Sequence, residues 1–300
     1  MSVEQPYLRI ATRKSELALW QANWVQRKLE ALGASADLVL IETKGDRTQQ
    51  DNRSFAQLSG QGFFTRAVQD AVLDGRADLA VHSHKDLPSA PVPGLEVAAV
   101  TRRADPRDVL LVRDGSEGEG PLPLATGSVV GTSAVRRQRQ LLALRPDLDV
   151  RELRGNVPTR VQKLRSGDYD AIVLAAAGLE RLSLDLSDLR VTPLEPTVMM
   201  PAPAQGTLAL ETRRDAYEAA SLLTELHDNE TYKAVAAERG LMSMLQGGCQ
   251  LALGAYASYE GGVVSLSAWY EGQTVKVQNP SSENAAMLAF EALGRPTVES

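Results

Sequence analysis

The chain contains one cysteine, Cys249, which follows two glycines in the run Gln246-Gly247-Gly248-Cys249-Gln250. Glycine pairs let the backbone turn tightly, so a thiol placed after them is well presented for covalent chemistry. A single cysteine is also among the most buried residue types, and it often acts only as a small apolar side chain. The residue alone favours this packing role, and the side chains expected around it decide whether it has a chemical one.

Charged and polar side chains, mostly cations and hydroxyl groups, recur at the points where predicted strands end. They are Arg13 and Ser15 after residues 7–12, Lys85 and Asp86 after residues 78–83, Thr132, Ser133, Arg136 and Arg137 after residues 128–131, Arg154, Asn156 and Arg160 after residues 149–153, and Arg181 after residues 171–175. In open α/β sheets, ligands bind at the carboxyl ends of the strands. We therefore expect these side chains to line one cleft.

Arginine in this arrangement indicates a polyanionic ligand. A cation in the first turn opposes the helix dipole, so helix stability does not explain Arg136 and Arg137. The planar guanidinium binds carboxylates and phosphates through paired hydrogen bonds, and helix N-termini add further donors. The alternative for any single arginine is a solvated surface charge. Several arginines at equivalent places favour a binding site.

An aspartate among these cations, Asp86, is expected to stay ionised, because opposite charges favour the charged form. An ionised carboxylate is a poor general acid, but it stabilises a cation that develops on a substrate and accepts hydrogen bonds from N–H groups. A local ion pair with Lys85 or a helix cap is the structural alternative. His82 and His84 lie two apart on a predicted strand and could hold a metal. Because only His227 remains elsewhere and there is no cysteine cluster, we predict no metal site.

Composition places the chain among soluble globular proteins. Its 300 residues, 43% hydrophobic and 23% charged, are enough for two or three domains. One cysteine excludes an intramolecular disulfide and points to a reducing compartment. We expect no signal peptide, because the N-terminal run lacks an apolar core, and no membrane span. The net charge of −6 argues against a general nucleic-acid binder.

Strand and helix patterns alternate over most of the chain, which predicts an α/β fold with helices on both faces of a parallel or mixed sheet. Residues 10–21 are echoed by residues 130–141, and residues 75–81 by residues 167–173, in matching order. This repeat favours two similar α/β domains with a cleft between them. The polar stretch 44–62 is expected to form a long mobile loop, and the proline-rich stretch 192–206 a linker back to the first domain.

The last part of the chain differs in character. Helical patterns at 231–245 and 282–293 enclose three short alternating segments, at 253–257, 263–269 and 273–277. Antiparallel strands with helices on one side indicate a small α+β domain. We therefore predict three domains, formed by residues 1–103 with 203–224, by residues 104–202, and by residues 225–300. Cys249 is expected on a loop of the third domain, between a helix and the sheet.

Together the motifs resemble one known family. The runs that carry the resemblance are RIATRKSELAL (9–19), ADLAVHSHKDLP (77–88), DPRD (105–108), GTSAVRRQ (131–138), RELRGNVPTR (151–160), YDAIVLAAAGLERL (169–182), PAPAQG (201–206) and GGCQ (247–250). They look like those of the hydroxymethylbilane synthases, also called porphobilinogen deaminases. They occur in the same order over nearly the whole chain, which is far more specific than any single motif.

The resemblance implies a monomeric, cytoplasmic enzyme of tetrapyrrole synthesis whose first two domains are like type II periplasmic binding proteins. In that family, a cysteine at the position of Cys249 carries a dipyrromethane cofactor through a thioether bond. This primer receives four porphobilinogen units in turn, each with loss of ammonia, and the linear tetrapyrrole hydroxymethylbilane is released by hydrolysis. Porphobilinogen carries acetate and propionate groups, so the growing chain is a polyanion and suits the arginines.

The roles of individual residues are implied by the motif positions that they occupy. Asp86 is expected to stabilise the cation left on the substrate when ammonia departs, and to hold pyrrole N–H groups. Besides the link to Cys249, the expected cofactor contacts are Ser83, Lys85, Thr132, Ser133, Arg136, Arg137 and Arg160. The expected contacts to substrate carboxylates are Arg13, Ser15, Arg154 and Arg181.

Two features depart from the family pattern. Gln57 and Gln61 stand where many members have lysines, which puts any salt bridge between that loop and the cofactor in doubt, because an amide weakens charge-assisted contacts. Residues 250–253 lack the proline that is common after the cysteine. We expect this change to alter the stiffness of the loop more than its chemistry.

Two other functions stay open. A solute-binding protein for a small polyanion would account for the cleft, but it offers no role for Cys249, and the expected absence of an export signal argues against it. A transferase or hydrolase that uses Cys249 as its nucleophile would need a histidine base, and none of the three histidines stands in a recognisable arrangement. The expected partner is therefore porphobilinogen alone, with neither nucleic acid nor membrane.

Overall fold

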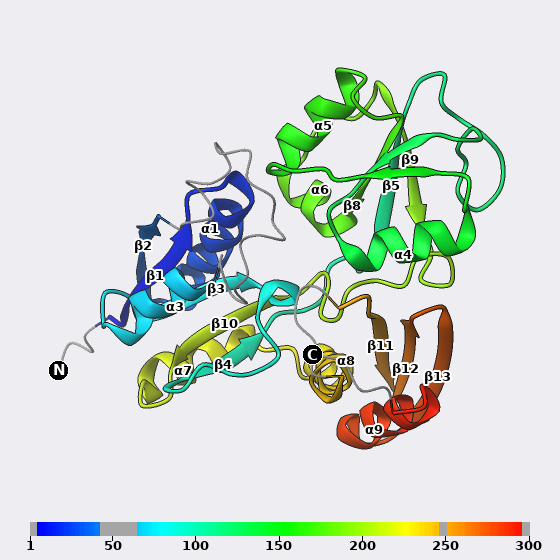
Figure 1. Ribbon diagram of the computed structural model, residues 1–300. Coiled ribbons are helices and arrows are strands. Elements are labelled where there is room, and N and C mark those ends of the chain that lie inside the picture. Colours follow the sequence, from blue (N-terminus) through cyan, green and yellow to red (C-terminus); the bar gives the residue numbers. More distant parts are fainter. Residues whose placement is uncertain (1–4, 43–64, 246–250, 296–300) are drawn as a thin grey trace. The chain divides into compact units, whose positions relative to one another are not determined.

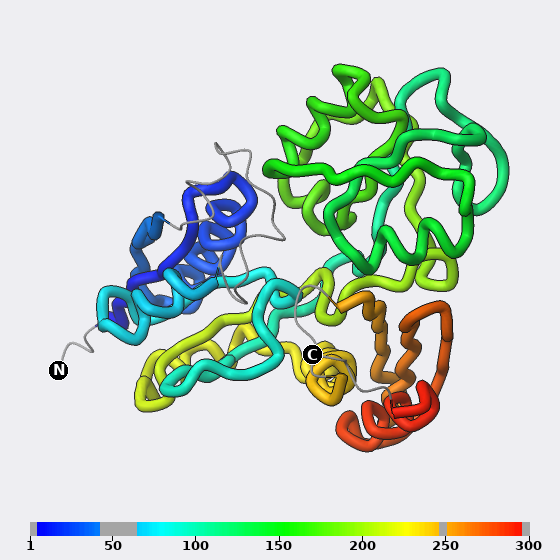
Figure 2. Tube along the Cα trace, in the orientation of Figure 1, coloured from blue at the N-terminus to red at the C-terminus, as the bar shows by residue number. Residues whose placement is uncertain are grey.

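The computed structural model describes residues 5–42, 65–245 and 251–295. The chain separates into two compact units, residues 1–103 with 207–232 and residues 104–206 with 233–300. The chain therefore leaves the first unit after residue 103 and returns to it at residue 207, as can be followed along the trace in Figure 2. The expected loop 44–62 and Cys249 lie outside the described residues. No helix in the described ranges is both long and apolar enough to cross a membrane.

The first unit is built on a five-stranded sheet (Figure 1). The strands are β1 (Tyr7–Arg13), β2 (Ser35–Ile41), β3 (Leu79–Ser83), β4 (Leu95–Val100) and β10 (Leu208–Arg213), and their spatial order is β2-β1-β3-β10-β4. β1 runs parallel to β2 and β3, whereas β10 runs antiparallel to β3 and β4. The helices are α1 (Glu16–Ala31), α3 (Arg66–Leu73) and α7 (Tyr217–Leu223), with short 3-10 turns at His84–Asp86 and Thr224–Leu226.

Alternation along β3 shows why helices cover both faces of this sheet. Leu79 and Val81 pack into one apolar cluster with residues of α1 and α7. Ala80 packs into a second cluster with residues of α3. Successive side chains of a strand point to opposite faces, so a strand that is buried on both faces needs a helix on each. Ser15 is the N-cap of α1, and its side chain accepts a hydrogen bond from the Ala18 N–H.

The second unit contains a sheet with the same plan. Its strands are β5 (Asp108–Arg113), β6 (Val129–Gly131), β7 (Asp149–Arg151), β8 (Ala171–Ala175) and β9 (Leu189–Leu194), in the spatial order β7-β6-β8-β5-β9. Its helices are α4 (Val135–Leu144), α5 (Val157–Arg165) and α6 (Ala176–Leu182). β6 is parallel to β7 and β8, and β5 is antiparallel to β8 and β9. Three parallel strands followed by an antiparallel fourth repeat the first sheet, which confirms the two similar α/β domains.

One sequence expectation was wrong at the end of this sheet. Residues 192–206 were expected to be a linker, but residues 192–194 form the last part of β9, where Pro193 pairs with Val109. Proline has no backbone N–H to donate to a neighbouring strand, so it is tolerated only where that side of the residue has no strand to pair with. β9 is the edge strand of the sheet, and the proline therefore does not interrupt it.

The remaining strands form a small antiparallel sheet of β11 (Gly254–Glu260), β12 (Val263–Tyr270) and β13 (Gln273–Asn279). Two helices accompany it, α8 (Asn229–Met244) and α9 (Ser282–Ala292). Buried residues of α8, α9, β11 and β12 make up one apolar cluster. This arrangement confirms the α+β character expected from the sequence. The exact limits of three separate domains stay a prediction.

Candidate functional site

The first unit holds a cavity of about 90 Å³ at the ends of its parallel strands. Arg13 is the last residue of β1, Ser15 caps α1, and Ser83 is the last residue of β3. These three side chains and Asp86 all line the cavity. Four of the five site residues that the sequence placed in this unit therefore line the same cavity. The fifth, Lys85, directly precedes Asp86 in the 3-10 turn His84–Asp86.

Hydrogen bonds hold the end of β3 in place. Gln21, on α1, is almost fully buried and donates to Ser83 Oγ at 2.8 Å. The backbone N–H of His84 donates to the carbonyl of Thr207 on the other side. Asp86 lies in the turn that follows, where its side chain is exposed. Within the described ranges its carboxylate has no hydrogen-bond or ion-pair partner, so it is available to a ligand.

A buried polar group lies against the same strand. His82 lines the cavity, and its Nε2 atom is 3.2 Å from Oε2 of Glu211 on β10. Gln69 on α3 donates to both Glu211 oxygens, at 2.9 and 3.2 Å. His84 was expected to share the strand with His82, but the strand ends at Ser83 and His84 begins the turn. In the part of the chain that the structure describes, no group of three or more His, Cys, Asp or Glu could hold a metal ion.

The second unit places its site residues on the equivalent turn, between β6 and α4. Ser133 Oγ donates to the carbonyl of Leu153, which follows β7. Thr132 Oγ1 accepts from the Ala134 N–H at 3.3 Å. Among the described residues, no side chain caps the N-terminus of α4. Because β6 and β7 are parallel, these residues all follow the carboxyl ends of neighbouring strands, where the sequence placed them.

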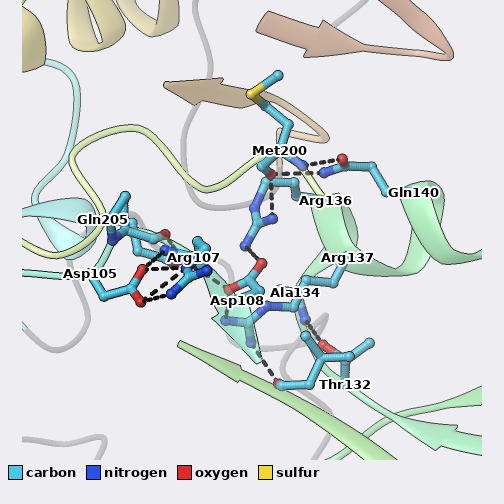
Figure 3. A network of polar contacts seen from close by, with 12 residues as sticks. Asp105, Arg107, Asp108, Thr132, Ala134, Arg136, Arg137, Gln140, Met200 and Gln205 are labelled. Atoms are coloured by element: carbon cyan, nitrogen blue, oxygen red, sulfur yellow. Dashed lines mark hydrogen bonds and ion pairs between the residues drawn. The ribbon is translucent and has the colours of Figure 1, made fainter. Parts of the chain in front are cut away.

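Arg136 and Arg137 both turn toward one buried carboxylate, that of Asp108 at the start of β5 (Figure 3). Arg137 Nη2 donates to Asp108 Oδ1 at 2.7 Å, and Arg136 Nη2 forms an ion pair with Oδ2 at 2.8 Å without hydrogen-bond alignment. Each guanidinium is held at a second point, because Arg136 Nη1 donates to the carbonyl of Met200 and Arg137 Nη1 to that of Val173. The Asp108 side chain is fully buried.

The charges of this cluster do not cancel. Burial opposes ionisation of Asp108, but the neighbouring charges of Arg136 and Arg137 outweigh it and hold the pKa of the carboxyl well below its usual range. Burial lowers the pKa of Arg136, and the charge of Asp108 opposes that shift. Two guanidinium groups thus face one carboxylate. In addition, Nε of Arg137 is buried and has no hydrogen-bond partner among the described residues.

Three further arginines of the predicted site follow β7 and β8. Arg154 donates to Oε1 of Glu152 through Nε and Nη2, at 2.9 and 2.7 Å. Arg160 Nε donates to the carbonyl of Gly155 at 2.7 Å. Arg181 lies in the last turn of α6, and its Nη2 donates to the carbonyl of Gly206 at 2.9 Å. Burial lowers the pKa of Arg181 to about 10, so the side chain is still cationic at neutral pH.

Sequence reasoning missed the partners of these residues. In the sequence, Asp108 was part of the run DPRD and was assigned no role. The signal that could have identified it is a carboxylate directly before the apolar run VLLV, which indicates a buried ion pair. Gln21, Glu211 and Gln205 carried no signal, because their contacts are distant in the sequence. Cys249, Gln57 and Gln61 lie outside the described residues. The structure positions five of the predicted site residues within the first unit and seven within the second unit.

Comparison with known proteins bears on most of the chain. The family described as porphobilinogen deaminase, dipyromethane cofactor binding domain, matches residues 8–221. The family described as porphobilinogen deaminase, C-terminal domain, matches residues 232–271. Among solved structures, the periplasmic VFT2 domain of BvgS from Bordetella pertussis is 15% identical with a TM-score of 0.44, covering 74% of this chain and 87% of that chain. The class of the fold follows from the strand order of the two sheets, described above.

Curated relatives agree with the family match. The chain is 48% identical over 253 residues to the porphobilinogen deaminase of Syntrophotalea carbinolica, which covers 84% of this chain and 78% of the relative. It is 49% identical over 250 residues to that of Mycobacterium marinum, covering 83% and 77%. It is 44% identical over 252 residues to that of Brevibacillus brevis, covering 83% and 79%. The chain therefore belongs to the porphobilinogen deaminase family.

Proposed function

We propose that the chain builds its product on a dipyrromethane primer attached through a thioether bond to Cys249, and that Asp86 serves each condensation. The activity of the family is that of hydroxymethylbilane synthase, a transferase of tetrapyrrole biosynthesis. It condenses four porphobilinogen molecules, each with loss of ammonia, and releases the linear tetrapyrrole by hydrolysis. The observation that carries the proposed roles is the cavity that Arg13, Ser15, Ser83 and Asp86 line together at the strand ends of the first unit.

The residues of the second unit fit an acidic cofactor. The buried cluster of Asp108, Arg136 and Arg137 has one positive charge in excess, and Arg137 Nε is a buried donor without a partner in the described ranges. Such a donor is costly unless a ligand accepts its hydrogen bond. We assign the cofactor contacts to Ser83, Lys85, Thr132, Ser133, Arg136, Arg137 and Arg160. When bound, the dipyrromethane supplies the free pyrrole carbon to which the first substrate is joined.

Asp86 suits the step in which ammonia departs. Its carboxylate is exposed, lines the cavity and has no competing cation bonded to it among the described residues. The substrate carbon becomes cationic when the C–N bond breaks, and a fixed carboxylate lowers the energy of that cation. The same oxygens can accept hydrogen bonds from pyrrole N–H groups. Gln21 supports this role indirectly, because it holds Ser83 at the end of the strand from which Asp86 is reached.

Substrate carboxylates would be held by Arg13, Ser15, Arg154 and Arg181. Arg13 and Ser15 line the cavity that contains Asp86. Arg181 is a desolvated cation whose pKa has fallen through burial, and a bound carboxylate would offset that burial. Arg154 is held beside Glu152, so a substrate carboxylate has to compete with that partner. We further propose a cytoplasmic monomer, on the basis of the single cysteine and the family resemblance.

The intact mass of the protein under denaturing conditions tests this proposal. Protein purified from cells that make porphobilinogen is expected to exceed its sequence mass by two pyrrole units. The variant Cys249→Ser is the matched control and is expected to show the unmodified mass. An unmodified mass in protein that consumes porphobilinogen would remove the primer from the mechanism. An unmodified mass together with no turnover would favour the solute-binding alternative.

A further inference from the structure

We infer that Asp108 is the positioning residue of the primer site: it holds Arg136 and Arg137 in place and leaves them one negative charge short, which a carboxylate of the ligand supplies. This inference rests on the proposed cofactor contacts of those two arginines. Asp108 itself is fully buried and therefore acts through the arginines. Its position in the cluster, between the two guanidinium groups, is shown in Figure 3.

Both oxygens of Asp108 are used within the cluster. Oδ1 accepts from Arg137 Nη2 at 2.7 Å and from Gln205 Nε2 at 2.9 Å, while Oδ2 pairs with Arg136 Nη2 at 2.8 Å. Each arginine also donates to a backbone carbonyl, at 2.6 and 2.9 Å. Two anchored nitrogens, together with the side chain attached at Nε, fix the plane of each guanidinium group. The ligand therefore meets arginines whose side-chain freedom was already lost when the protein folded.

The charge balance says what kind of ligand completes the cluster. Only 5% and 7% of the side chains of Arg136 and Arg137 are exposed, and one buried carboxylate faces both. An uncompensated buried charge is unfavourable, so a second anion stabilises the cluster. Two groups of N–H donors indicate where this second anion binds. The first turn of α4 lacks a side-chain cap, and Arg137 Nε is buried without a partner in the described part of the chain.

The neighbouring Asp105 provides a matched control. It lies in the same short segment, but it is bonded to Arg107 near the surface, where 29% of its side chain is exposed. The variants Asp108→Asn and Asp105→Asn remove the same charge three residues apart. Only the first removes a buried charge that orients the two arginines.

The experiment starts from protein made in cells that lack porphobilinogen, so that the primer is absent. Porphobilinogen is then added, and the gain of primer mass is followed over time by intact mass measurement. Loss of the arginine geometry is expected to slow loading of Asp108→Asn by about tenfold or more, because misplaced binding groups cost rate steeply. Asp105→Asn is expected to load like the unchanged protein. Equal loading by both variants would overturn the inference.

A second measurement separates positioning from general damage to the fold. The melting temperature of the unloaded protein is recorded with increasing sodium sulfate, and sodium chloride at matched ionic strength is the reference. The cluster of Asp108→Asn lacks two negative charges instead of one, so sulfate is expected to raise its melting temperature more than that of the unchanged protein. An equal sulfate response would show that Asp108 does not set the charge of an anion site.

Arg137→Lys keeps the test decisive if Asp108→Asn does not fold. Lysine preserves the charge, but it cannot bridge a carboxylate and a carbonyl with fixed geometry. This variant is expected to load slowly, whereas normal loading would contradict the positioning role. If even the unchanged protein gains no mass, the proposed function fails, and the sulfate measurement still decides the role of Asp108.

Discussion

Glu238 is the buried carboxylate whose removal has the most defined consequence for stability. It lies on α8 and is fully buried. Its Oε2 accepts the N–H of Ala204 at 2.6 Å, and its Oε1 accepts the N–H of Ala257 on β11 at 2.7 Å. One side chain thus ties the segment before β10 and the small sheet to the helix that precedes the Cys249 segment. The change Glu238→Gln tests this tie with almost no change in volume.

The magnitude follows from the two hydrogen bonds. An amide offers one oxygen, so one of the two N–H groups keeps an acceptor while the other faces an NH₂ group. A buried donor left without a partner costs about 1–3 kcal/mol, and the surviving bond loses the strength that the carboxylate charge provided. We expect Glu238→Gln to reduce the free energy of unfolding by about 2–4 kcal/mol. The exposed pair of Glu291 with Arg295 provides a control, because Glu291→Gln should cost only about 0–1 kcal/mol.

Urea unfolding followed by tryptophan fluorescence measures the effect in the second unit alone. The chain has three tryptophans, Trp20 and Trp24 on α1 and Trp269 on β12. Changing Trp20 and Trp24 to phenylalanine leaves Trp269 as the reporter of the small sheet. A loss below about 1 kcal/mol for Glu238→Gln, or a loss equal to that of Glu291→Gln, would refute the reasoning. Slower primer loading is expected to accompany the loss of stability, because α8 leads into the segment that carries the cysteine.

Two further expectations concern single carboxylates. Asp86→Asn should lower kcat by about 100-fold with an unchanged melting temperature, because an exposed side chain contributes little to stability but faces the developing cation. Asp37→Asn changes another exposed aspartate of the first unit, on β2, and should turn over normally. The pH dependence of stability tests the charge of Asp108. The pKa of Asp108 in the folded protein lies below its value of about 3.9 in the unfolded chain. The ionised carboxylate therefore stabilises the fold above about pH 4, and this stabilisation is lost as the pH falls through the folded-state pKa. The difference in melting temperature between Asp108→Asn and the unchanged protein should therefore be constant from about pH 5 to 8 and should narrow below about pH 4. Normal turnover by Asp86→Asn would remove that residue from its role, and a pH-independent difference would show that Asp108 acts without its charge.

The order of the elements could be predicted from the sequence because it depends on local patterns. Ser15 caps α1 through its own backbone neighbours, and Gly33 ends the same helix region with a positive φ of 85° that suits glycine. The repeat between residues 10–21 and 130–141 corresponds to β1 with α1 and to β6 with α4. The strand ends that carry Arg13, Ser83 and Thr132 were identified in the same way.

Pairings across the sheets could not be predicted in this way. Gln69 and Glu211 are 142 residues apart and meet only because β10 inserts beside β3. Asp108 and Arg137 are 29 residues apart and meet because β5 runs antiparallel beside β8, against α4. Pro193 was taken as the mark of a linker because its tolerance depends on an edge position, which is a property of the finished sheet.

By itself, the sequence determined the residue types of the site and the strands and helices that carry them, since periodicity, caps and turn residues act over a few neighbours. The tertiary structure alone decided how the charges are compensated. It gave Arg136 and Arg137 a shared buried partner, and it left Asp86 exposed with no partner among the described residues. The reason is that the balance of buried charges depends on which strands become neighbours, and this order results from burial of the whole chain and not from any local run of residues.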